Sequence, residues 1–348
     1  MTATPGAPSD DGFSRRSLRR STVRALRRVF GTASLEDWQL DVEASLRDLR
    51  AHRAALGDAR VRSDHHLYEV QRTLDKVRLT LDEHQRMLAV FAFEAWLDLE
   101  RPESDTIVTV VMATRNRAAH LGAAIDSVRR QRHERWELIV VDDGSIDNTP
   151  EILAKVKEQQ VRVLHLDHVG VCAARNVALA AATGDVVTYL DDDNIMHPGW
   201  LQAVAWAFSR NPDDNVLYGA RIIDDVRAVT SRSRGGLPFV HFVAFDRERL
   251  AAANIADMNV IAHRRGHLEA RFDERLSEFG DWELFVRLTG KRDPLELPAI
   301  ACAYGTTASD RLSDRPEHLT AGEYERVRAT IAEQTARRRS AARSGDES

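Results

Sequence analysis

The chain has 348 residues and a formal net charge of −5, from 49 basic and 54 acidic side chains. A balance this small gives no indication of a nucleic-acid partner. The two cysteines, Cys172 and Cys302, lie far apart in the sequence, so they indicate neither a disulfide framework nor a metal site. No apolar run approaches the ~20 residues that cross a bilayer. Residues 1–11 also lack the apolar core of a signal peptide, so we expect a cytoplasmic protein.

Residues 1–33 are expected to form an arm without a fold of its own. Residues 1–14 are small and polar and predict disorder. Residues 15–30 can form a short basic amphipathic helix, in which most arginines lie off the apolar face. Such a helix can bind peripherally to an anionic membrane on the cytoplasmic side. A solvated arginine-rich arm is the alternative interpretation.

Residues 34–101 are predicted to be helical, because proline first reappears at Pro102. Between residues 67 and 91 a heptad seam recurs every three or four positions, through Leu67, Val70, Leu74, Val77, Leu81, His84, Leu88 and Phe91. Two structures fit this seam: a coiled coil between subunits, which would make a homo-oligomer, or a helical arm packed on its own chain. About three and a half heptads are marginal alone, so the pattern does not decide between them.

Residues 105–310 have the alternating pattern of an α/β domain. Strands are predicted at 107–112, 137–141, 161–166 and 185–190, and helices at 118–130, 149–159, 171–182 and 198–209. This order predicts a mostly parallel, Rossmann-like sheet, in which ligands bind beyond the carboxyl ends of the strands. The alternation breaks down after residue 224. Residues 311–348 predict a polar helix followed by a disordered tail from Ala336.

Two acidic motifs lie at the ends of predicted strands. Asp191, Asp192 and Asp193 follow one strand, and Asp142 and Asp143 end another. Three adjacent carboxylates repel one another unless a positive charge lies among them. No glycine-rich phosphate loop is present in the sequence, so a carboxylate-bound divalent cation is the expected holder of phosphates.

Five blocks in order carry a resemblance to a known family. They are Thr109–Arg117, Leu138–Ser145, Gly170–Asn176, Tyr189–Asp193 and Phe272–Leu284. Together they closely resemble the GT-A fold, family 2 glycosyltransferases. A run of aspartates alone would be a weak signal, but five ordered blocks at plausible spacing are a strong one.

The resemblance implies an inverting transfer of a sugar from a nucleoside-diphosphate-sugar, with a UDP-sugar favoured, to an acceptor hydroxyl. It implies Mn²⁺ or Mg²⁺ as cofactor and a glycan or lipid-linked acceptor, as in glycan, cell-wall or surface polysaccharide synthesis. The processive, membrane-embedded branch carries QxxRW after its base. Gln131, Arg135 and Trp136 have the wrong spacing and position for that motif, so we predict a non-processive enzyme.

The resemblance also implies roles for individual residues. Asp193 matches the metal ligand, and Asp191 would contact the ribose or the metal through water. Asp281 matches the general base. A base should lie apart from the metal cluster, where the cation would lower its basicity, and Asp281 is about ninety residues downstream of that cluster. The expected nucleotide-binding residues are Thr114, Arg115, Asn116, Asp142, Asp143 and Arg175.

Each role has a structural alternative. Asp142 and Asp143 can cap a turn, Asp281 can be a helix N-cap, and Arg175 can simply pair with a carboxylate. Family members often carry an acidic residue before the base, where this chain has Gly280. Gly280 and the heptad seam motivate a second hypothesis, a non-catalytic coiled-coil assembly protein with a degenerate transferase domain.

Overall fold

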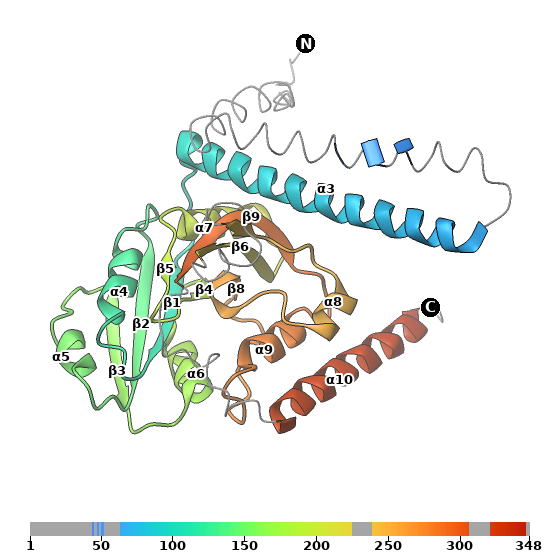
Figure 1. Ribbon diagram of the computed structural model, residues 1–348. Coiled ribbons are helices and arrows are strands. Elements are labelled where there is room, and N and C mark those ends of the chain that lie inside the picture. Colours follow the sequence, from blue (N-terminus) through green and yellow to red (C-terminus); the bar gives the residue numbers. More distant parts are fainter. Residues whose placement is uncertain are drawn as a thin grey trace, which may run out of the picture. The chain divides into compact units, whose positions relative to one another are not determined.

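The computed structural model describes residues 63–224, 239–305 and 321–345, together with residues 44, 47, 48, 50 and 51 (Figure 1). The predicted arm, residues 1–33, lies outside these ranges. The chain divides into two compact units, residues 1–95 and 96–348. Among the described helices, none is both long and apolar enough to span a membrane.

One long helix, α3 (Ser63–Glu100), covers the predicted heptads. Two residues of the seam, Leu74 and Leu81, are 41% and 39% exposed. The polar ring of His84 is satisfied within the helix, because its Nδ1 forms a 2.6 Å hydrogen bond with the backbone carbonyl of Thr80. The continuous helix agrees with the predicted helical segment, and its use as a coiled coil stays a prediction.

Four parallel strands form the half of the sheet that carries the acidic motifs. They lie in the order β3-β2-β1-β4, and all three pairings are parallel. Their bounds are β1 (Val108–Thr114), β2 (Trp136–Asp143), β3 (Val161–Leu166) and β4 (Val186–Tyr189). Nearly every residue of β1 and β2 is buried, which explains their continuous apolar runs. Thr114 pairs with Asp142 in register, so both strands end at one edge.

The remainder of the nine-stranded sheet is mixed, which corrects the mostly parallel sheet that we predicted. β8 is antiparallel to both β4 and β6, β9 is parallel to β6, and β5 and β7 are antiparallel to β9 and β6. The first four strands are parallel because helical crossovers join them, whereas β4 pairs with β8 and β5 with β9, strands far apart in the chain that no single βαβ crossover joins. The bounds are β5 (Ile195–Met196), β6 (Val216–Asp224), β7 (Phe239–His241), β8 (Ile261–Arg264) and β9 (Leu295–Gly305).

Most helices follow the predicted pattern. Those between the first strands are α4 (Leu121–Arg129), α5 (Thr149–Leu153), α6 (Val171–Ala181) and α7 (Trp200–Arg210). Those after β7 are α8 (Arg247–Ala252), α9 (Gly280–Leu288) and α10 (Ala321–Gly345).

Two predicted helix ends are wrong. The prediction extended α5 to Gln159, but the helix stops at Leu153, its last buried residue, because none of the residues from 154 to 159 is buried against the domain. α10 continues past Ala336, where we predicted disorder. One face of it packs on α9 through the buried Val327 and Gln334.

Gly184, just before β4, lies where the parallel strands β1 and β4 pack closely. A Cβ there would lie 2.8 Å from the Ile107 carbonyl oxygen and 2.9 Å from the Thr109 amide nitrogen. We expect Gly184→Ala to lower the free energy of unfolding by about 1–3 kcal/mol, because backbone atoms cannot move aside.

Gly122→Ala is the matched control in denaturant unfolding. Nothing lies within 4 Å of its Cβ position in α4, so this change should raise the free energy of unfolding by up to about 1 kcal/mol. Equal unfolding midpoints for the two variants would contradict the packing described here.

Candidate active site

Two arginines lie among the three adjacent aspartates that follow β4. The Arg117 guanidinium is 3.7 Å from Asp192 and 4.0 Å from Asp193. Arg175, from α6, donates a 2.8 Å hydrogen bond to Oδ1 of Asp191. The positive charge that the cluster requires is therefore supplied in part by the protein itself.

Asp191 is held at both carboxylate oxygens. Arg175 occupies Oδ1, and the Asn259 amide donates to Oδ2 at 2.9 Å. The Asn259 carbonyl also accepts from the backbone amide of Asp191 at 2.7 Å. The Arg175 guanidinium lies over the ring of Phe272, 5.4 Å from its centroid. A carboxylate fixed in this way suits contact with a ribose or a water molecule better than direct ligation of a metal.

Asp192 lies deeper than its neighbours and is 7% exposed. Burial raises the pKa of Asp192 to about 7, although the Thr114 hydroxyl and the Arg117 guanidinium act in the opposite direction. The buried Asp192 side chain thus faces Arg117 and is less accessible to a ligand than its neighbours.

The turns after β1 and β2 are joined by hydrogen bonds. The backbone amide of Asn116 donates to Ser145 Oγ at 2.9 Å, and Asn116 Oδ1 accepts from the amide of Ile146 at 2.8 Å. Asn116 has a φ of 55°, a left-handed conformation that asparagine tolerates. Arg115 and Asn116 are exposed, whereas Thr114 is buried at the end of the strand.

Asp142 and Asp143 organise the loops around them. Asp142 accepts from the backbone amide of Ser145 at 3.0 Å. Asp143 accepts from the amides of Val169 and Gly170, at 2.6 and 3.0 Å, and so fixes the loop before α6. Both side chains are buried. The turn-capping alternative is therefore real for both residues, and their contact with a nucleotide stays a prediction.

Asp281 lies in the first turn of α9, one residue inside the helix rather than at the N-cap, which is Phe279. Its Oδ1 accepts from the amide of Trp282 at 2.7 Å, and its Oδ2 accepts from the Asn254 side chain at 2.9 Å. Burial raises the pKa of Asp281, and the charge of Asp191 adds to this; the Trp282 amide, Arg175 and Asn254 lower it. A carboxylate with a raised pKa is a better proton acceptor than an ordinary surface aspartate.

The α/β domain is similar to known proteins. Residues 109–269 match the sequence profile described as Glycosyl transferase family 2. The chain carries a glycosyl transferase family 2 domain.

Among curated relatives, an uncharacterized glycosyltransferase of Nostoc sp. is 34% identical over 120 residues, which are 34% of this chain and 37% of that protein. A second, from Escherichia coli, is named UDP-Glc:alpha-D-GlcNAc-diphosphoundecaprenol beta-1,3-glucosyltransferase. It is 35% identical over 92 residues, 26% of this chain and 36% of that one. The chain thus spans little more than a third of either relative.

A solved structure of residues 1–349 of Staphylococcus aureus TarS in complex with UDP-GlcNAc resembles this chain with a TM-score of 0.54. The sequences are 20% identical, and the match covers 66% of each chain. The likeness confirms the predicted GT-A fold of the family 2 domain.

The described residues could bind a divalent cation only together with a diphosphate. Within the described ranges, no three His, Cys, Asp or Glu side chains are arranged to hold a metal ion. Asp193 can supply one carboxylate oxygen, with diphosphate oxygens and waters completing the shell, as Mg²⁺ accepts. Asn194, 1% exposed, has both side-chain polar atoms without a hydrogen-bond partner among the described residues. A buried unsatisfied amide next to Asp193 is consistent with a bound ion or water there.

The glycine at position 280, before Asp281, has a steric reason. A Cβ at this position would lie 2.6 Å from Cys172 Sγ, on α6. Cys172 is 1% exposed, and burial raises the pKa of its thiol to about 11, so it fills space as a neutral group. A side chain at residue 280 would therefore have to displace Cys172, which is a steric reason for glycine at this position.

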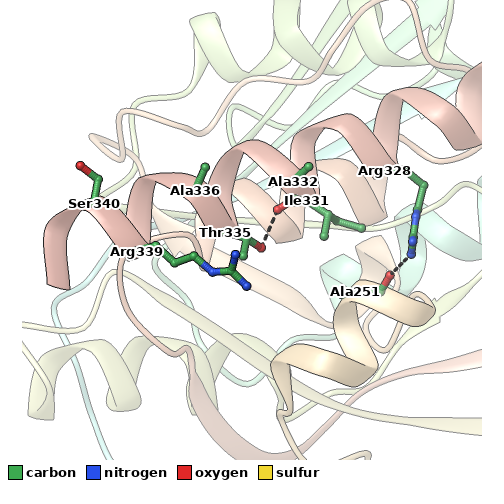
Figure 2. A pocket seen from close by; sticks show the side chains of 8 residues that line it. All are labelled: Ala251, Arg328, Ile331, Ala332, Thr335, Ala336, Arg339 and Ser340. Atoms are coloured by element: carbon green, nitrogen blue, oxygen red, sulfur yellow. Dashed lines mark hydrogen bonds between the residues drawn. The ribbon is translucent and has the colours of Figure 1, made fainter. Parts of the chain in front are cut away.

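A groove of about 630 Å³ lies between α8 and α10 (Figure 2). Its lining residues on α10 recur every three or four positions and form one face of that helix. They are Arg328, Ile331, Ala332, Thr335, Ala336, Arg339 and Ser340. Arg328 donates to the carbonyl of Ala251 on α8 at 3.1 Å. None of the lining residues belongs to the predicted site.

The structure gathers the predicted residues into two joined groups. Thr114, Arg115, Asn116, Asp142 and Asp143 lie at the ends of β1 and β2, whereas Arg175, Asp191, Asp193 and Asp281 lie around the end of β4 and the start of α9. Sequence analysis assigned no role to Arg117, Asn254 or Asn259. Arg117 stood inside a quoted block, but the two asparagines lie in a segment without periodic signal.

The Cys172–Gly280 contact predicts non-additive effects on stability. Gly280→Ala alone should lower the free energy of unfolding by about 1–3 kcal/mol through overpacking. Combining it with Cys172→Ala should cost at least ~0.5 kcal/mol less than the sum of the single changes. Cys302→Ala, at the other buried cysteine, is the control and should combine additively with Gly280→Ala. Additivity in both cycles would show that the contact does not constrain residue 280.

Proposed function

We propose that the protein is a non-processive, inverting glycosyltransferase that moves a sugar from a nucleoside-diphosphate-sugar to an acceptor hydroxyl. The observation that carries this proposal is Asp281, a half-buried carboxylate with a raised pKa that stands outside the Asp191–Asp193 cluster. Arg175 interacts with both the cluster and the base, because it donates a hydrogen bond to Asp191 and its charge lowers the pKa of Asp281. A base kept apart from the metal cluster retains its basicity, as the reaction requires.

In this mechanism the cluster and the base have separate tasks. Asp193 would hold Mn²⁺ or Mg²⁺ on the donor diphosphate, and the bound ion would neutralise charge on the leaving group. Asp191 would contact the ribose or a metal-bound water. Asp281 would accept the proton of the acceptor hydroxyl at Oδ1 or Oδ2. The hydroxyl oxygen would attack the anomeric carbon from the face opposite the diphosphate while the bond from that carbon to the diphosphate oxygen breaks, which inverts the configuration.

A UDP-sugar is the donor we favour. Support comes from the name of the Escherichia coli relative, which specifies UDP-Glc, and from the TarS structure, which contains UDP-GlcNAc. We propose that Thr114, Arg115 and Asn116, with Asp142, Asp143 and Arg175, surround the nucleoside.

The acceptor we propose is a glycan or a lipid-linked glycan, in cell-wall or surface polysaccharide synthesis. The same relative is named for a diphosphoundecaprenol-linked acceptor. Such an acceptor fits an enzyme that works in the cytoplasm at the membrane surface, with the basic residues 15–30 binding anionic lipid.

Donor binding is the first test. Isothermal titration of UDP-, GDP- and dTDP-sugars, each with Mn²⁺ or Mg²⁺, should show binding of at least one donor, and Asp193→Ala should weaken it ~10-fold or more by removing the metal ligand. Asp213→Ala, at an exposed aspartate after α7, serves as the control and should bind like the wild type. A wild-type protein that binds none of these donors would contradict the proposal.

Loss of the base is the second test. Asp281→Asn should lower the rate of transfer ~10²- to 10⁴-fold and leave donor affinity nearly unchanged, because the amide cannot accept the proton. In the wild type the rate should rise with pH through the pKa of Asp281, which burial raises above its ordinary 3.8. Transfer that survives in Asp281→Asn would place the base elsewhere, and a wild type that binds donor without transfer or hydrolysis would favour the non-catalytic alternative.

A further inference from the structure

We propose that Asn254 is the residue that positions the base, because its side chain holds the carboxylate of Asp281 in one orientation. Asn254 follows α8, and its Nδ2 donates to Asp281 Oδ2 at 2.9 Å. Asn254 is exposed and Asp281 is half-buried, so the amide lies on the solvent side of the carboxylate. The inference rests on the function proposed above and adds a residue to its machinery.

The orientation of the Asn254 amide is fixed by a second contact. Its Oδ1 accepts from the backbone amide of Ala256 at 3.2 Å. Because only the carbonyl oxygen can accept that bond, the NH₂ group must face the carboxylate. The turn made by Asn254 therefore presents a hydrogen-bond donor to Asp281.

Two donors then hold the two oxygens of the base. The Trp282 amide binds Oδ1 and Asn254 binds Oδ2, so the plane of the carboxylate is set from both sides. An ionised carboxylate has about four acceptor positions, and lone pairs remain on each oxygen for the acceptor hydroxyl. The second N–H of Asn254 can donate to the same hydroxyl. Fixing a base in reacting geometry is a large part of its contribution to rate.

The same short segment also holds the donor side of the site. Asn259, five positions after Asn254, binds Asp191 through its side chain. Asp257 holds this segment in turn, because its Oδ1 accepts from the amide of Asn259 at 2.9 Å. The segment 254–259 therefore carries one contact to the base and another to the aspartate cluster.

The hydrogen bond from Asn254 also favours the ionised form of Asp281. The other charged and titratable groups facing this carboxylate are Arg175 and Cys172, on α6, and Asp191, after β4. None of them changes when Asn254 is replaced. A shift in the titration of Asp281 on replacement of Asn254 therefore reports the lost hydrogen bond.

Asn254→Asp is the decisive variant. It keeps the oxygen that accepts from Ala256 but replaces the donor to Asp281 by a carboxylate. We expect kcat at neutral pH to fall ~10- to 100-fold and the acidic limb of the rate profile to move up by ~1 pH unit or more, so that activity returns at high pH. Donor affinity should stay within ~2-fold, because the nucleotide contacts are untouched.

Asn211→Asp is the matched control. It removes an asparagine donor at the far end of α7, where Nδ2 bonds to the carbonyl of Ala207 at 2.8 Å, and should leave the pH profile in place. Asn254→Ala covers the case in which the aspartate variant loses donor binding through misfolding, and should shift the limb in the same direction. Wild-type profiles in both Asn254 variants would overturn the inference.

A readout independent of turnover separates this inference from the proposed function. In protein labelled with ¹³C-aspartate, Asp281 should titrate at higher pH in Asn254→Ala than in the wild type. This shift supports the positioning contact even if the wild type transfers no sugar, an outcome that would contradict only the proposed function. An unchanged titration overturns the inference whether or not the enzyme is active.

Discussion

The ion pair between Arg175 and Asp191 is the interaction on which the rest of the site depends. Asp191 to Asp193 and Asp281 place four carboxyl groups in one site, and their mutual repulsion would destabilise it without an internal cation. Arg175 is largely buried, packs over Phe272 and bonds to Asp191 at 2.8 Å. Arg175 lies on α6, so the position of this helix places the guanidinium beside Asp191. The loop before α6 is held by Asp143, which accepts from the amides of Val169 and Gly170.

The aspartate cluster is thus only partly neutralised before any ligand arrives. Arg117 approaches Asp192 and Asp193, and Arg175 binds Asp191. In the proposed reaction a donor diphosphate would add about two negative charges, and one divalent cation would balance that added charge.

The elements with a periodic apolar pattern could be predicted from the sequence, whereas the irregular segments could not. Asp142, Asp143 and Asp191 to Asp193 could be located because parallel strands end at one edge of a sheet, whatever the loops do. The mixed half of the sheet could not, because its pairs join strands far apart in the chain, such as β4 with β8 and β5 with β9, and no local pattern fixes their direction. Asn254 and Asn259 belong to an irregular segment whose side chains act through turns, which leave no periodic trace. Gly280 was explained only by Cys172, a residue over one hundred positions away.

The segment from Asn254 to Asn259 has a consequence for how such an enzyme can diversify. Because it ties Asp281 to Asp191, its length works as a spacer that sets how far the proton acceptor stands from the bond being broken. A single inserted residue would alter that separation. Under the proposed function, the length of this segment would therefore limit which changes of the acceptor side the site tolerates.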